Sequence, residues 1–384
     1  MTLNSPFTSS PAKPGHGEVI LSLLPPSIPT LTTLTFKYPL KLLSRSPGFI
    51  PESSVLPSAA TRPIHLYLLT YGGGLLPGDH IDVSITLKPA TRLVVTTPQG
   101  STKIFKTAPG GRKSQRGGLG GANKNETEYM SRQTLDVDIG REAALCYLPD
   151  PSAPFKDSRY EQVQRFTVDG SVTGNQRSSL CVLDWVTQGR TSRGENWDFH
   201  FWKGKNEVYL SDDLVGGGKK KKKKLLLRDS VILDNEVPYP YPYPDSDPSN
   251  GENGTSTEKE TPNSTSTGTN TIIRERTHPH GIVGTLILYG PLFDSLASFF
   301  MQKFTSHPRI GGRNWSSSSS VPSNSSSSKP KYDVTWTSAR VRAGFVLVKF
   351  GAKDFETARD WLGSIIREEG SVVREFGEEA LFCL

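Results

Sequence analysis

The chain has 384 residues, of which only 34% are hydrophobic, a low share for one compact core of this length. Part of the chain is therefore expected to lie outside any core. The net charge of +7 comes largely from one run of six lysines, Lys219 to Lys224, and the remainder is close to neutral. This balance argues against a broad nucleic-acid-binding face.

The three cysteines are far apart and form no CxxC pair, which argues against a structural zinc site and against a disulfide framework. The first residues, MTLNSPFTSSPAKPGHG, contain no apolar core of a secretory signal, and no stretch of about 18 apolar residues follows. A cytoplasmic location without membrane contact is therefore expected.

Alternating apolar and polar residues, typical of strands with one face on a core, recur along the chain. In HIDVSITL (80–87) the apolar members are every second residue. Further strands are predicted in TRLVVTT (91–97), TLDVDI (134–139), AALCYL (143–148), RFTV (165–168), SLCVLDWV (179–186), WDFHFW (197–202), NEVYL (206–210), KLLLRD (224–229) and RAGFVLVKF (342–350). The fold class that follows is mainly β, a large antiparallel assembly of ten or more strands with a few helices packed on it.

Two helices are predicted near the C-terminal end. In GPLFDSLASFFMQKF (290–304) the apolar residues gather on one side, and DFETARDWLGSIIREEG (354–370) has them at helical spacing. Asp354 is a suitable N-cap and Gly370 a suitable stop for the second helix.

Four segments have the composition of solvated insertions, at about residues 107–127, 214–224, 236–272 and 311–331. Their Gly, Lys, Ser, Thr and Asn residues cannot offset the entropy lost on ordering. Because predicted strands continue on both sides of each insertion, we expect residues 1–384 to form a single domain with its core at about 15–384.

The stretch YGGGLLPGD (71–79) raises the question of a phosphate-binding loop. A P-loop needs GxxxxGK[ST] between a strand and a helix, whereas here Asp79 follows the last glycine and a strand comes next. Pro77-Gly78-Asp79 is good turn chemistry, so a connection between two strands is the better interpretation. The polar stretch TTPQGSTKIFK (96–106) is either a hairpin turn or a patch for partner contact. No GxSxG, HExxH or helix-opening GxGxxG motif is present, so no enzyme class is indicated.

These two stretches, in this order, resemble the UreD (UreH) family of urease accessory proteins, with its Gly-Gly-x-x-x-Gly-Asp stretch and a following Thr-Thr-Gln-x-x-Thr-Lys-like stretch. Four further segments resemble family segments in the same order: LCYLPDPSAPFKDSRY (145–160), LDWVTQGRTSRGENWDF (183–199), LLLRD (225–229) and HGIVGTLILYG (280–290). Many members carry Glu where this chain has Pro151, next to Asp150. The long insertions make the chain resemble a eukaryotic, fungal-like member.

The resemblance implies a non-catalytic scaffold. It would bind a UreF-type protein, through the two predicted helices and the C-terminal segment, and a UreG-type GTPase, and would deliver nickel into apo-urease for metallocentre assembly. GTP hydrolysis would belong to the partner. No cofactor would be tightly bound, and nickel would pass in transit through an internal polar tunnel. The rival hypothesis is a β-rich binding module for another partner, without metal delivery.

A nickel path needs weak ligands that release the ion. Acidic residues within or beside the matched segments are the candidates, with Asp79, Asp184 and Glu195 preferred and Asp150 and Asp157 weaker. Asp184 is notable because it interrupts an apolar strand, where an unpaired charge is costly. A salt bridge from Asp184 to an arginine such as Arg190 is the equally weighted alternative.

Overall fold

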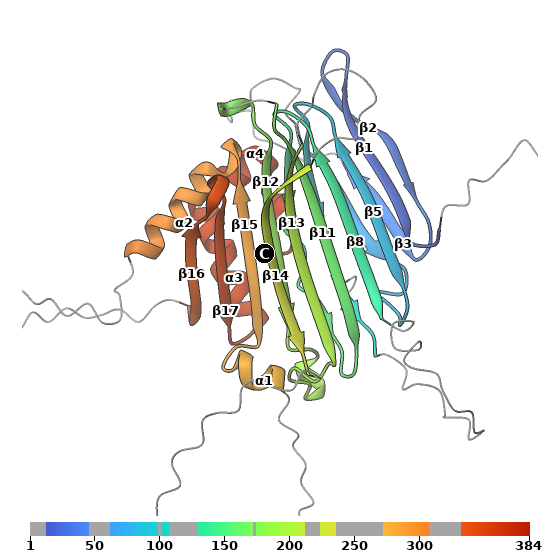
Figure 1. Cartoon of the computed structure of the whole chain (residues 1–384), viewed down its shortest axis with the longest axis vertical. Coiled ribbons are helices and arrows are strands. Elements are labelled where there is room, and N and C mark those ends of the chain that lie inside the picture. The colour runs from blue at the N-terminus through green and yellow to red at the C-terminus, as the bar shows by residue number, and fades with distance from the viewer. Residues whose placement is uncertain are drawn as a thin grey trace, which may run out of the picture.

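The computed structural model describes residues 13–45, 62–98, 102–106, 130–171, 174–211, 223–235, 272–306 and 332–384. Two β-sheets face each other, and helices cover the outer face of one of them (Figure 1). Strands and a few helices therefore make up the described chain, which confirms the mainly β class. No helix in these ranges is long and apolar enough to cross a membrane.

The seven-stranded sheet has the order β14-β13-β11-β8-β5-β1-β2. Its strands, in chain order, are β1 (His16–Leu24), β2 (Ile28–Phe36), β5 (His80–Leu87), β8 (Ser131–Ile139), β11 (Arg159–Asp169), β13 (Phe201–Ser211) and β14 (Lys223–Asp234).

The eight-stranded sheet has the order β16-β17-β15-β12-β9-β6-β4-β3. Its strands are β3 (Leu40–Arg45), β4 (Ile64–Thr70), β6 (Arg92–Thr96), β9 (Ala144–Tyr147), β12 (Ser179–Thr187), β15 (Ile282–Tyr289), β16 (Val334–Arg340) and β17 (Val346–Ala352). Two short strands, β7 (Lys103–Ile104) and β10 (Ala153–Pro154), pair with each other.

The strands in the middle of each sheet are parallel, so the antiparallel assembly expected from the sequence is wrong there. Apart from the short strands β7 and β10, the chain alternates between the two large sheets from β4 to β13, and from β6 on each strand lies beside the one two steps earlier in this alternation. Antiparallel pairs are confined to the flanks: β1–β2, β3–β4, β13–β14, β12–β15, β15–β17 and β16–β17. A period of two fixes which face of a strand is buried but says nothing about the direction of its neighbour.

This alternation gathers related loops at one end of the molecule. The connections that follow β4, β6, β9 and β12 all lead from the eight-stranded to the seven-stranded sheet, and they therefore lie at the same end, which we call the motif end. The beginning of β15 and the end of β17 lie there too, because β12, β15 and β17 are antiparallel neighbours. Segments that resemble the UreD family thus meet at this end, except LLLRD (225–229), because the beginning of β14 pairs with the end of β13.

The helices are α1 (Ile272–Thr277), α2 (Asp294–Ser306), α3 (Phe355–Glu369) and α4 (Ser371–Phe376). Both predicted helices are confirmed, and α3 begins and ends as expected. The Asp354 side chain accepts a hydrogen bond from the Thr357 amide at 2.8 Å, and Gly370 closes the helix in the left-handed conformation. Apolar residues of α2 and α3, among them Phe300 and Leu362, pack on the outer face of the eight-stranded sheet.

The predicted strand WDFHFW is only partly confirmed, because β13 begins at Phe201. Trp197 and Phe199 are buried in the preceding connection, where Trp197 has a positive φ of 60° and donates from Nε1 to the His280 carbonyl at 3.0 Å. The insertions at 107–127 and 311–331 lie outside the described residues. So do those at 214–224 and 236–272, except that Lys223 and Lys224 begin β14 and residue 272 begins α1.

Candidate functional site

The glycine-rich stretch is a turn at the motif end, as predicted. The Leu75 amide donates to the Lys103 carbonyl at 2.8 Å, and the Phe105 amide donates to the Leu75 carbonyl at 3.0 Å. A Cβ on Gly74 would lie 2.6 Å from the Lys103 carbonyl oxygen, so only glycine allows this approach. The first two matched stretches are therefore packed directly on each other.

Two hollows meet at this end. A surface cleft of about 250 Å³ is bounded by the 102–103 segment, the connection after β12 and the start of α3. A smaller cavity of about 20 Å³, which has room for a single water molecule, lies deeper between the sheets. Thr102 and Asp150 line both hollows. The interior cavity and the cleft are therefore neighbours at these two residues.

Asp184 lines the interior cavity from β12 and is 6% exposed. Its carboxylate accepts hydrogen bonds from Asn206 Nδ2 at 2.7 Å and from Gln162 Nε2 at 3.2 Å. Burial raises the pKa of Asp184 from 3.8 to about 6. The hydrogen bond from Asn206 acts in the opposite direction and lowers it, but burial has the larger effect. A Cβ on Gly204 would lie 2.7 Å from Asp184 Oδ2, so the glycine leaves room for this carboxylate.

Polar side chains continue from Asp184 toward one flank of the two sheets. In the eight-stranded sheet Asp184, Thr285 and Lys349 are in register across β12, β15 and β17. In the facing sheet Gln164, Asn206 and Asp229 are in register across β11, β13 and β14. Hydrogen bonds join the two rows, because Asn206 contacts Asp184 and Lys349 Nζ lies 2.6 Å from Asp229 Oδ1. We call these six residues the polar layer.

Asp150 stands between the cleft and the cavity and is 9% exposed. Its backbone amide donates to Thr97 Oγ1 at 2.9 Å. Burial raises the pKa of Asp150 from 3.8 to about 6. The Cys383 thiol lies beside it, and burial together with the Asp150 charge raises the pKa of Cys383 to about 12. The cysteine is therefore a neutral thiol at physiological pH, not a thiolate ligand.

Glu195, rather than Asp184, is the partner of Arg190. The guanidinium contacts Glu195 Oε1 through Nε at 2.9 Å and through its terminal nitrogen, and the Arg190 amide donates to Oε2 at 2.9 Å. Burial favours the neutral acid, but hydrogen bonds and the charge of Arg190 outweigh it and lower the pKa of Glu195. The alternative suggested for Asp184, an ion pair with Arg190, is therefore not formed.

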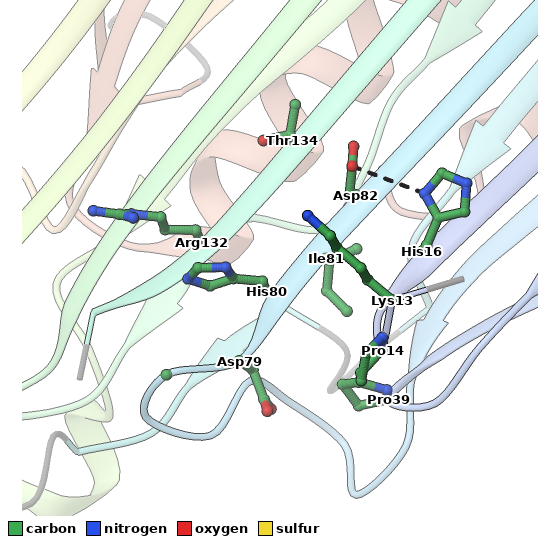
Figure 2. A pocket seen from close by; sticks show the side chains of 11 residues that line it. Lys13, Pro14, His16, Pro39, Asp79, His80, Ile81, Asp82, Arg132 and Thr134 are labelled. Carbon is green, nitrogen blue, oxygen red and sulfur yellow. Dashed lines mark ion pairs between the residues drawn. The ribbon is translucent and has the colours of Figure 1, made fainter. Parts of the chain in front are cut away.

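Asp79 and Asp157 occupy other surroundings at the motif end. The Asp79 carboxylate accepts from the Leu76 amide at 2.8 Å and so closes the glycine-rich turn. It borders an open hollow of about 880 Å³ on the outside of the seven-stranded sheet, where Figure 2 shows it pointing away from the Asp82–His16 pair. Asp157 pairs with Lys106 at 2.7 Å and faces His200 at 3.8 Å.

The structure thus brings Asp150 and Asp184 to one interior cavity and places Asp79, Asp157 and Glu195 apart from it. Their part in a metal path stays a prediction. Sequence reasoning missed Asn206, Asp229 and Lys349. A signal for Lys349 was present, because it interrupts the apolar run VLVKFGA of β17 as Asp184 interrupts SLCVLDWV of β12. Within the described ranges, no group of three or more His, Cys, Asp or Glu could hold a metal ion.

Two facing sheets, with an apolar core that the polar layer interrupts, define the class of this protein as a two-sheet β protein. A model of the UreD urease accessory protein family matches residues 16–243, more than half of the chain. The chain belongs to the UreD family of urease accessory proteins.

Three relatives span fungi and plants. Urease accessory protein 4 of Cryptococcus neoformans is 33% identical over 226 residues, covering 58% of this chain and 61% of that protein. Urease accessory protein D of Arabidopsis thaliana is 38% identical over 184 residues, covering 48% and 51%. A urease accessory protein ureD-like chain of Schizosaccharomyces pombe is 27% identical over 341 residues, covering 89% and 90%. The chain therefore matches between half and two thirds of the length of the first two relatives.

Proposed function

We propose that this chain is a non-catalytic scaffold in urease maturation, which acts in the cytoplasm with a UreF-type protein and a UreG-type GTPase to deliver nickel into apo-urease. One observation carries the proposal: two buried carboxylates, Asp150 and Asp184, line an interior cavity, and Asp150 also lines the neighbouring surface cleft. That the chain belongs to the UreD family of urease accessory proteins supports urease as the protein that receives the nickel.

The electrostatics of the two carboxylates favour a passing cation. A pKa raised to about 6 means that burial disfavours the ionised form of Asp150 and of Asp184. A divalent cation beside them would compensate this cost, because opposite charge stabilises a carboxylate in a low-dielectric interior. Because each carboxylate supplies only a few ligand atoms, the ion would be held weakly and could leave again. The two carboxylates therefore act as transient binding sites on a path that leads from the cleft past Asp150 to Asp184.

For partner binding we propose the surface formed by α2, α3 and the C-terminal segment. The inward faces of both helices are occupied by the sheet, so contacts would use their outward faces and nearby exposed apolar residues. Phe382 is 66% exposed and follows the helical turn Glu378–Leu381. A large exposed aromatic side chain is a common anchor of protein interfaces.

The experiment combines the chain with UreF-type and UreG-type proteins and apo-urease from the same organism, with NiCl₂ and GTP. We expect a complex that contains all the components and a urease that gains nickel and activity only when the chain is present. The rival hypothesis, a binding module for another partner, predicts that urease is activated equally well without the chain. Absence of a complex with the UreF-type protein would also contradict the scaffold role.

A further inference from the structure

Three oxygen-bearing side chains stand in one line inside the protein. Gln164, Asn206 and Asp229 are in register on β11, β13 and β14, and adjacent strands lie about 4.8 Å apart. All three are at least nine-tenths buried, with exposed fractions of 0%, 1% and 8%. They belong to the polar layer, on the side of the seven-stranded sheet.

Each of the three carries a buried oxygen without a hydrogen-bond partner among the described residues. These atoms are Gln164 Oε1, Asn206 Oδ1 and Asp229 Oδ2. Gln164 Nε2 is also unpartnered, so nothing in the described chain fixes the orientation of that amide. A buried acceptor normally has a partner, because leaving it unpaired is costly. Three neighbouring acceptors that all lack a partner leave a place for a group that offers positive charge or a hydrogen-bond donor, which a cation or a water molecule can supply.

The charges around this row also leave room for a cation. Asp184 faces it from the other sheet, with Asn206 Nδ2 at 2.7 Å from Oδ2. Among the described residues, the ammonium in contact with this row is that of Lys349, whose Nζ lies 2.6 Å from Asp229 Oδ1. The Lys349 side chain is 46% exposed, so its flexible stem can swing toward solvent.

We propose that Gln164, Asn206 and Asp229 bind a divalent cation through these three oxygens, opposite Asp184, and that the Lys349 ammonium is a counter-ion which the cation displaces. Carboxylate and amide oxygens are ordinary ligands of hard divalent cations. That the cation is nickel rests on the proposed function. The binding site itself is inferred from the three buried oxygens and from the charges of Asp229, Asp184 and Lys349.

Competition with a lysine makes such a site reversible. When the cation leaves, the ammonium returns to Asp229, and the buried carboxylate is never without a positive neighbour. The site lies beyond Asp184 as seen from the cleft, and the partly exposed Lys349 side chain stands between it and solvent. It is therefore the point from which a cation that has passed Asp184 would leave the protein.

The test is equilibrium dialysis of the purified full chain, freed of any affinity tag, against NiCl₂. Lys349→Met should bind one Ni²⁺ roughly fivefold more tightly, because the competing ammonium is removed. Asp229→Asn should lose that site. The matched control is Lys203→Met, which removes a lysine paired with Glu161 at 2.7 Å on the outer face and should leave binding unchanged.

Weaker or unchanged binding by Lys349→Met would overturn the proposal. Should that variant fail to fold, Gln164→Leu provides an independent test, because it removes one ligand oxygen without touching an ion pair. It should weaken Ni²⁺ binding several-fold, and equal binding by wild type and Gln164→Leu would mean that the row holds water only. The dialysis involves neither urease nor partner proteins. A negative result would therefore leave the delivery role, with its own reconstitution test, unaffected.

Discussion

Replacing Asp184 with asparagine should stabilise the protein at neutral pH. The side chain is buried, and its pKa is raised from 3.8 to about 6. The folded state therefore binds the proton more tightly than the unfolded state, and folding takes up protons between about pH 4 and pH 6. In that window the stability contributed by this group falls as the pH rises. At pH 7 the ionised carboxylate costs roughly 3 kcal/mol, at 1.36 kcal/mol for each unit of pKa.

Asparagine removes this cost and keeps the shape. The Asn206 amide can turn so that its unpartnered Oδ1 accepts a hydrogen bond from the new amide nitrogen. We therefore expect Asp184→Asn to equal wild type in stability near pH 4 and to exceed it by up to about 3 kcal/mol at pH 7. Thermal or urea unfolding of both proteins at pH 4.5, 5.5 and 7.0 measures the difference. A variant that is less stable than wild type by the same amount at every pH would contradict a raised pKa of Asp184 in the folded state.

Three further predictions follow from single contacts. Glu195→Gln should destabilise the protein by about 1–2 kcal/mol at pH 7, because the pKa of Glu195 is lowered by Arg190, and urea unfolding should show this gap closing as the pH falls below about 4.5. Gly204→Ala should cost about 1–3 kcal/mol in urea unfolding, because its Cβ would lie 2.7 Å from Asp184 Oδ2; an unchanged midpoint would contradict the close contact. Asp354→Ala should lower stability by about 1 kcal/mol through loss of the α3 cap, whereas Asp354→Asn should be close to neutral in thermal melts.

The sequence predicted the local elements better than their assembly. α3 carries its own signals, since Asp354, the apolar spacing and Gly370 all lie within one segment. The direction of β5 relative to β8 carries no such signal, because both alternate in the same way whether they run parallel or antiparallel. Only the chain's alternation between the two sheets makes these neighbours parallel.

The candidate site was predictable from the sequence only where a charged residue interrupts the apolar residues of a strand. Asp184 interrupts an apolar strand and was recognised on that basis. Asp229 shares its strand face with Leu227 and Val231, which lie two residues to either side of it in β14, so the period of two does place this charged residue on the buried face, a signal that the sequence analysis left unused. The choice of Arg190 between Asp184 and Glu195 depended on the loop conformation after β12, which no spacing in the sequence reports.

The most direct test of a nickel path through Asp184 is the nickel content of urease that has been matured with the Asp184→Asn variant. The variant should be folded and bound to its UreF-type and UreG-type partners, because Asp184 lies between the sheets and away from the α2–α3 surface. Metal analysis of the reconstituted urease, compared with that obtained with the wild-type chain, gives the result. We expect an intact complex and a urease with much less nickel and activity. A fully nickel-loaded, fully active urease would contradict a path through Asp184.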